Sequence, residues 1–261
     1  MTTAAMTAPR FEMGRVVNLT FGAIGRNWLV FGLLALLLSA IPQGLVAWFR
    51  TELIASRAPG TITTTTSLFV GGVTSLVAMA GMVIMQAAMA HGVISDLNGR
   101  KASFAECLQT GLRFALPVLG ILALMILGVG LGCILLIVPG VMLFLAWMVA
   151  VPAEVVERTG VFGAFSRSAA LTRNHRWSLL GLYAIYFILS LILSMAVLAL
   201  SGGFQAAAQM IAARAPLVLA VTAVIQVVQT VIASAGTAAI YYELRSIKEG
   251  IGPEALASVF D

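Results

Sequence analysis

The chain has few charged residues and few reactive side chains. Of its 261 residues, 10% are Asp, Glu, Lys or Arg, two are Cys and two are His. A soluble domain carries about 25% charged residues, so this composition excludes a soluble globular protein. Two cysteines cannot build a disulfide scaffold. The low charge also excludes a disordered chain, because such chains are polar and highly charged.

Long apolar runs take the place of the missing charge. Hydrophobic residues make up 61% of the chain, and the mean hydropathy is +1.04. A helix of about 20 apolar residues crosses a bilayer. We therefore predict an all-α polytopic protein with one membrane domain, residues 1–261, and no room for a separate catalytic domain. The predicted spans are about 27–49, 67–91, 114–130, 133–152, 177–201 and 216–242.

The third and fourth spans are inferred from a single apolar stretch. Phe114 to Pro152 is nearly free of polar residues, and this is too long for one crossing of a hydrocarbon core about 30 Å thick. Glycines at 128, 130 and 132 predict a tight reversal there, and Pro139-Gly140 predicts a bend at the start of the fourth span.

The basic residues predict the orientation. Twelve Lys and Arg residues fall in segments that six spans would place on one side, and three fall on the other. The positive-inside rule then puts both termini on the cytoplasmic side of the membrane. The larger group is Arg10, Arg15, Arg26, Arg100, Lys101, Arg113, Arg158, Arg167, Arg173, Arg176, Arg245 and Lys248, and the smaller is Arg50, Arg57 and Arg214.

Three short amphipathic segments precede the odd-numbered spans. We predict cytoplasmic interfacial helices at about 11–25, 103–112 and 160–173, each starting near a Phe. Ser103 and Glu106 have the spacing of a capping box at the start of the second. The recurrence suggests a three-fold repeat of helical hairpins. Composition alone can also produce such weak similarity, so both interpretations stay open.

Basic residues near the second and third amphipathic segments are candidates for lipid headgroups. Cations at an anionic leaflet attract phosphate, but positive-inside topology by itself also places basic residues here. The candidate residues are Arg100, Lys101, Arg167, Arg173 and Arg176.

The sixth span carries a polar side within the membrane. Thr222, Gln226, Gln229 and Thr230 recur at spacings of three and four. They predict either a polar path or lipid site, with Gln43 and Gln86 opposite, or ordinary hydrogen bonding between helices.

No Asp, Glu, Lys or Arg lies near the middle of a predicted span, which disfavours proton-coupled transport and voltage sensing. We expect no metal site and no cofactor, and a nucleic-acid partner is not expected because the basic residues flank the spans. Small residues at Gly128 and Gly132 and at Ser190 and Ser194 fit packing within the monomer or a homo-oligomer.

Two segments resemble a known family. The first is LLIVPGVMLFLAWMVAVPAEVVERTGVFGAFSRSAALTRNHRWSLLG, residues 135–181, and the second is YYELRSIKEG, residues 241–250. Both resemble bacterial membrane proteins grouped with the membrane domain of glycerophosphoryl diester phosphodiesterases. The resemblance implies a six-span inner-membrane protein, in some members fused to a soluble phosphodiesterase. That enzyme's barrel would need more residues than remain here, so its activity is not carried over.

Two functions from different classes follow. The first is a non-enzymatic protein of the inner membrane that interacts with lipids, expected to be anionic, or acts as a scaffold or accessory component with a protein partner. The second is a transporter or channel for a small uncharged or lipid-like solute. An intramembrane enzyme is disfavoured because the predicted spans offer no acid–base or nucleophile pair.

Overall fold

A computed structural model describes residues 11–45, 64–200 and 216–249 of the chain, and every element in these ranges is helical. Six helices are long and apolar enough to cross a bilayer, so the protein is an all-α polytopic membrane protein, as predicted. Residues 1–10, 46–63, 201–215 and 250–261 lie outside the described residues. The six spans are Trp28–Leu45, Gly71–Leu97, Ala115–Leu135, Ile137–Glu157, Arg176–Ala196 and Val221–Glu249.

Three amphipathic helices precede the odd-numbered spans at the predicted places. They are α1 (Met13–Arg26), α5 (Phe104–Arg113) and α9 (Val161–Thr172). At the start of α5 the Glu106 amide donates to the Ser103 hydroxyl at 3.3 Å, and the Ser103 amide donates to the Glu106 carboxylate at 3.0 Å. The predicted capping box is therefore present, and it fixes where α5 begins.

The first span has a widened turn caused by Pro42. It begins as α2 (Trp28–Ala35) and continues through the π-helical turn η1 (Leu36–Ala40). A proline lacks the amide hydrogen that would bond the carbonyl four residues earlier, and its ring displaces that carbonyl; here the carbonyl belongs to Leu38. The Leu38 oxygen packs against Gly81 of α4 (Thr64–Leu97), where an added Cβ would lie only 2.1 Å away. Gly81 thus permits the two backbones to meet.

The third and fourth spans form a tight hairpin of α6 (Ala115–Leu135) and α7 (Ile137–Trp147). The reversal lies at Leu136, which is extended with φ −161° and ψ 143°, so the reversal predicted at Gly128–Gly132 was wrong. All three glycines lie within α6, and α7 packs against Gly128 and Gly132. A Cβ at Gly128 would lie 2.4 Å from the Trp147 ring, and one at Gly132 would lie 2.9 Å from Gly140 Cα.

The fourth span is interrupted before it ends. Residues Met148 and Val149 separate α7 from α8 (Ala150–Glu157). Pro152 explains the break, because its ring cannot be accommodated against the carbonyl of Met148 in a regular helix. The last turns of this span can therefore follow a different direction from the hairpin.

The helices meet in an order that repeats three times. The second span of each pair, α4, α7–α8 or α12 (Pro216–Glu249), carries the amphipathic helix of the next pair: α5 packs on α4, α9 on α7 and α8, and α1 on α12. The helices α4, α8 and α12 also contact one another at the centre. This order is the one expected for the predicted three-fold hairpin repeat.

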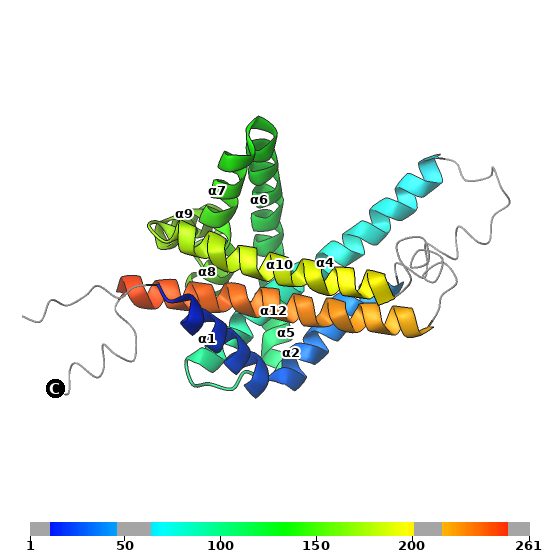
Figure 1. Cartoon of the computed structure of the whole chain (residues 1–261), viewed down its shortest axis with the longest axis horizontal. Coiled ribbons are helices and arrows are strands. Elements are labelled where there is room, and N and C mark those ends of the chain that lie inside the picture. The colour runs from blue at the N-terminus through cyan, green and yellow to red at the C-terminus, as the bar shows by residue number, and fades with distance from the viewer. Residues whose placement is uncertain (1–10, 46–63, 201–215, 250–261) are drawn as a thin grey trace, which may run out of the picture.

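The spans spread apart away from this centre. In Figure 1 the α6–α7 hairpin points away from α12 and α10 (Arg176–Leu200), which lie side by side. Only 6% of the span in α10 is buried, against 50% of the span that contains α8. The tightly packed part of the protein is therefore one end of the spans, where α1, α5, α9 and the last turns of α4, α8 and α12 meet. We call it the charged end.

Candidate functional site at the charged end

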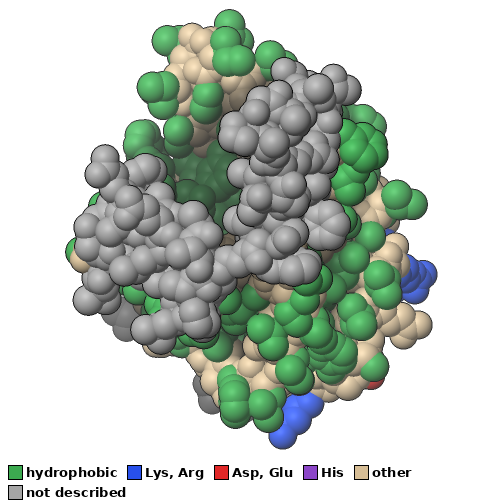
Figure 2. All heavy atoms as spheres, turned by 90° about the vertical axis from the view of Figure 1, so that its right-hand side faces the viewer, with side chains coloured by type: hydrophobic (Ala, Val, Ile, Leu, Met, Phe, Trp, Pro, Cys, Tyr) green, Lys and Arg blue, Asp and Glu red, His purple; other side chains and the backbone are tan. Residues whose placement is uncertain are grey.

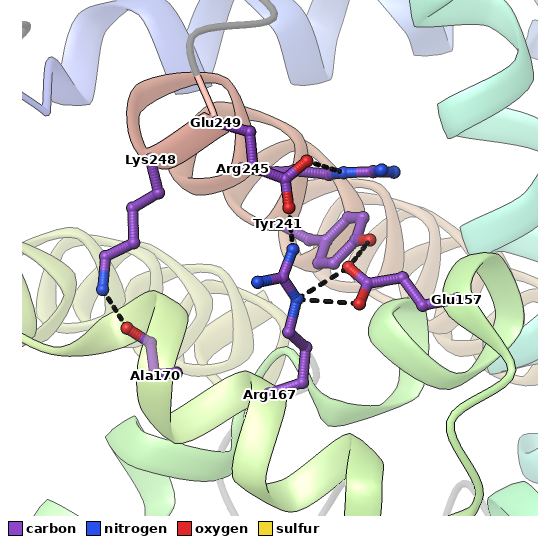
Figure 3. Close-up of polar contacts among 7 residues, drawn as sticks. All are labelled: Glu157, Arg167, Ala170, Tyr241, Arg245, Lys248 and Glu249. Atoms are coloured by element: carbon purple, nitrogen blue, oxygen red, sulfur yellow. Dashed lines mark hydrogen bonds and ion pairs between the residues drawn. The ribbon is translucent and has the colours of Figure 1, made fainter.

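Arg167 of α9 joins two other helices at the charged end. Its Nε lies 2.7 Å from Glu157 Oε2 and 2.9 Å from Oε1, and its Nη2 binds the Glu249 carboxylate. Figure 3 shows the guanidinium between the two carboxylates, with Tyr241 and Arg245 beside them. Tyr241 donates to Glu157 Oε1 at 2.7 Å, and Arg245 Nε lies 2.7 Å from Glu249. These contacts tie α9 to the ends of α8 and α12.

The carboxylates also perturb Arg167 itself. Burial lowers the pKa of Arg167, but the hydrogen bonds and negative charges of Glu157 and Glu249 outweigh it, so the net effect is a raised pKa. A guanidinium that stays charged and is held by two carboxylates forms strong, directional bonds. Arg167 therefore acts as a fixed link between helices.

Lys248 adds a contact from α12 to α9. Its Nζ donates to the carbonyl of Ala170 in the last turn of α9 (Figure 3). Carbonyls in the last turn of a helix have no partner within the helix and carry partial negative charge, so a lysine stabilises them. The charge of Lys248, together with burial, lowers the pKa of His175 just beyond α9.

Two further ion pairs involve α1. Arg15 Nε lies 3.1 Å from Glu243 of α12, whose side chain is 2% exposed. Arg26, the last residue of α1, binds Asp96 near the end of α4 at 2.5 Å, and Asn27 donates to the same carboxylate at 2.7 Å. The hydrogen bonds that Arg26 donates to Asp96 raise the pKa of Arg26. These ion pairs therefore join α1 to the last turns of α4 and to α12.

Two hydroxyl groups of α9 lie at a backbone carbonyl next to the break in the fourth span. Ser168 donates to the carbonyl of Ala146 at 2.7 Å, and Thr172 lies 3.4 Å from the same oxygen. Both side chains are fully buried. Ala146 stands just before the break in the helix, where its usual partner in the next turn is displaced. A buried carbonyl needs a donor, and α9 supplies it.

Residues of α8 and α9 meet the last turns of α12 at this place. Within residues 164–172, Ala164 and Leu171 are buried, Arg167 holds the ion pairs, and Ser168 and Thr172 face Ala146. From α12, Tyr241 and Glu249 join the cluster around Arg167, Arg245 pairs with Glu249, Lys248 contacts Ala170, and Glu243 pairs with Arg15 of α1. These side chains dock α9 on α12.

The five predicted headgroup residues do not form one site. Arg167 lies between carboxylates, and Arg176 is half-buried with its Nε lacking a hydrogen-bond partner. Arg100, Lys101 and Arg173 are exposed, and none has an ion pair with a described residue. Arg100 and Lys101 follow α4, whereas Arg173 follows α9.

Part of the polar side of the sixth span forms hydrogen bonds with α10. Gln229 donates to the Ser190 hydroxyl of α10 at 2.9 Å, and the Tyr186 hydroxyl lies 3.3 Å from the Gln229 carbonyl. Thr222 and Thr230 are half-buried, and Gln226 is exposed. Sequence reasoning treated Ser190 only as a small residue and missed its hydrogen bond.

The two glutamines predicted to lie opposite, Gln43 and Gln86, have no hydrogen bond to the described part of α12. Gln43 donates to Ser39 in its own span at 3.0 Å, and Gln86 is half-buried on α4.

Burial raises the pKa of the Cys107 thiol on α5 to about 11, so at neutral pH it is a small packing residue. In the described ranges, no group of three His, Cys, Asp or Glu residues could hold a metal ion.

A known family matches the part of the chain that contains most of these helices. A model described as a domain of unknown function (DUF7847) matches residues 67–244. The chain belongs to the DUF7847 family. The match includes α4 to α10 and α12 as far as Leu244, and with them Glu157, Arg167 and Tyr241. No curated protein and no solved structure matches the chain.

Proposed function

We propose that this DUF7847 protein is a non-enzymatic, lipid-interacting component of a bacterial inner membrane, with the charged end and both termini on the cytoplasmic side. The observation that supports it is the pairing of exposed cations with exposed apolar side chains at that end. Arg100, Lys101 and Arg173 are exposed, and Phe162 and Trp177 are 79% and 77% exposed.

This combination suits the boundary between headgroups and acyl chains. Aromatic rings on an amphipathic helix enter the interface, and each Lys or Arg near an anionic leaflet contributes about 1 kcal/mol. Because the described acidic residues at the charged end are largely taken up by internal ion pairs, the exposed cations set the charge that the membrane meets. The positive-inside rule supports the cytoplasmic orientation.

The rest of the surface also suits lipid. Figure 2 shows hydrophobic side chains over much of the described part of one face, with Lys and Arg near its edges. Such a surface fits acyl chains or the apolar helix of a membrane partner, so an accessory or scaffold role is compatible with lipid binding. The resemblance to the phosphodiesterase-associated membrane proteins supports the same lipid connection.

Lipid retention tests the proposal. The protein would be placed in nanodiscs of phosphatidylcholine with a minor share of phosphatidylglycerol, and bound lipids would be measured by native mass spectrometry. Enrichment of phosphatidylglycerol should fall in R100Q/K101Q/R173Q. The matched control R50Q/R57Q/R214Q removes three cations from the side predicted to be opposite and should keep the enrichment. Equal retention of the two lipids by the unchanged protein would contradict the proposal.

Gln226 favours the second candidate, a transporter for an uncharged or lipid-like solute. Its carboxamide is exposed on a membrane span, where a polar group without a partner is costly. The adjacent Gln229 is held by Ser190, which instead supports helix packing. Liposome flux of small polar solutes and of labelled lipid, compared between the unchanged protein and Q226L/Q229L, distinguishes the two, because only a transporter would lose flux.

A further inference from the structure

Two arginines at the charged end lie beside the same aromatic ring, and no carboxylate of the described residues pairs with either of them. The Cζ atom of Arg113 lies 6.0 Å from the centre of the Phe114 ring, and that of Arg158 lies 5.8 Å from it. Both arginines are exposed, whereas Phe114 is buried. Neither arginine has an ion pair among the described residues. Both guanidinium groups thus lie beside the same ring, and neither is neutralised by a carboxylate of the described residues.

The same position in the first repeat is neutralised within the protein. Arg26 ends α1 and Arg113 ends α5, and in both cases one residue separates the arginine from the following span. Arg26 binds Asp96 near the end of the second span of its pair. At the end of the second span of the next pair stands Arg158, directly after Glu157. The acidic residue near the end of this span, Glu157, is bound by Arg167, so among the described residues Arg113 has no anion equivalent to Asp96.

The carboxylates closest in sequence form no ion pair with either arginine. Glu154 is 4% exposed and has no ion pair with a described residue. Glu157 is bound by Arg167 and Tyr241, and Glu106 closes the capping box of α5. The position of Arg158 is also unfavourable for an arginine, since its φ is +53°, a left-handed conformation in which glycine carries no steric cost. An arginine here gives up that advantage and presents a guanidinium.

We infer that Arg113 and Arg158 bind the phosphate group of an anionic phospholipid. Guanidinium groups match phosphate oxygens in pairs of parallel hydrogen bonds, and the ligand would supply the negative charge that Asp96 supplies to Arg26. This inference rests on the proposed interaction with lipid and gives it a defined site.

The surroundings favour a lipid over free phosphate. Leu112 and Leu116, on either side of Arg113 in sequence, are 57% and 80% exposed, and Phe162 is 79% exposed. The start of α9 adjoins α6, because a Cβ at Gly120 would lie 3.4 Å from Val161. A phosphate held at Arg113 would therefore have apolar side chains beside it, where acyl chains can lie.

A pair of equivalent variants tests the site. R113Q and R26Q each remove one positive charge from the end of an amphipathic helix on the same side. In nanodiscs of phosphatidylcholine and phosphatidylglycerol, we expect R113Q to retain on the order of tenfold less phosphatidylglycerol by native mass spectrometry, with its melting temperature unchanged. R26Q should retain the lipid and melt at a lower temperature, because Asp96 loses its partner.

R158G removes the second arginine with a residue that suits the backbone conformation at this position. Glycine fits the left-handed position, so R158G should melt no lower than the unchanged protein and should still lose the retained lipid. Equal retention by R113Q, R158G and R26Q would overturn the site. If enrichment in the unchanged protein persisted in all three, the proposed function would stand without this site; without any enrichment, both would fail.

A titration with inorganic phosphate tests whether the ligand is free phosphate and not a lipid. The protein in discs of phosphatidylcholine alone would be titrated with inorganic phosphate and its melting temperature followed. No stabilisation is expected, since a lone phosphate leaves the surrounding apolar side chains without a partner. Stabilisation that disappears in R113Q would identify free phosphate as the ligand and overturn the lipid assignment.

Discussion

Tyr241 of α12 donates a hydrogen bond of 2.7 Å to the Glu157 carboxylate at the end of α8. The same carboxylate receives the guanidinium of Arg167 from α9, so a single acidic residue binds partners from two other helices. Tyr241 is 1% exposed, and its hydroxyl therefore depends on this carboxylate in the place of water.

Replacing Tyr241 by Phe removes this bond and keeps the ring. A hydrogen bond to a charged group contributes about 1.5–3 kcal/mol, so Y241F should lower the free energy of unfolding by about that amount. Unfolding in mixed detergent micelles, followed by circular dichroism, measures it. Y183F is the matched control because Tyr183 is 39% exposed and its hydroxyl has no hydrogen bond to a described residue. Equal stability of the two variants would contradict the role of Glu157.

Replacing Ser168 by Ala leaves the Ala146 carbonyl with only the longer contact from Thr172. An unsatisfied buried acceptor costs about 1–3 kcal/mol, and S168A should lose stability within that range. Ser166 lies on the same helix and is exposed, so S166A should change stability by less than about 0.5 kcal/mol. The same unfolding measurement applies, and an unaffected S168A would show that the break in the fourth span needs no donor.

Replacing Gly81 by Val places a side chain where the Leu38 carbonyl lies. With the first added atom 2.1 Å from that oxygen, the first span must move off α4, and we expect G81V to be poorly folded or to lose about 3 kcal/mol or more. G72A tests the same helix at an exposed glycine with no neighbour within 4 Å and should fold normally. Detergent gel filtration and melting temperature distinguish the two outcomes.

Acidification should loosen the start of α5. The bonds to Ser103 lower the pKa of Glu106 below its usual range, so the carboxylate stabilises the folded state above the pKa that it has in the unfolded chain. This contribution is complete above about pH 5.5 and is lost as the pH falls through the lowered pKa. Hydrogen exchange of the amides in the first turn of α5 should rise between about pH 5 and 3.5, after correction for intrinsic rates. In E106Q, which has no titrating carboxyl group at this position, this pH dependence should be absent; an unchanged profile would argue against the role of Glu106 in the capping box.

The sequence predicts the elements of this fold better than their partners. Hydropathy identifies the six spans because a span must be apolar along its length, and the Ser103–Glu106 spacing identifies the start of α5 because the two residues are local. The reversal at Leu136 was missed because glycines serve both turns and close helix packing. In this hairpin, Trp147 and Gly140 occupy the space that the glycines leave.

The candidate site shows the same limit. Arg167 was predicted to face headgroups, yet its partner Glu249 is 82 residues away, and a count of charges does not tell which acid reaches which base. Gln229 could be recognised as polar within a span, but its partner Ser190 is separated by 39 residues. Relationships of this kind become visible only once the helices are placed.

The ion pair between Arg15 and Glu243 connects α1 to the last turns of α12. Because α1 precedes all six spans in sequence and Glu243 lies in the sixth, this pair can form only after all six spans have been synthesised. The position of α1 is therefore fixed late, by a residue of the sixth span. A chain truncated before Glu243 would leave Arg15 without this carboxylate.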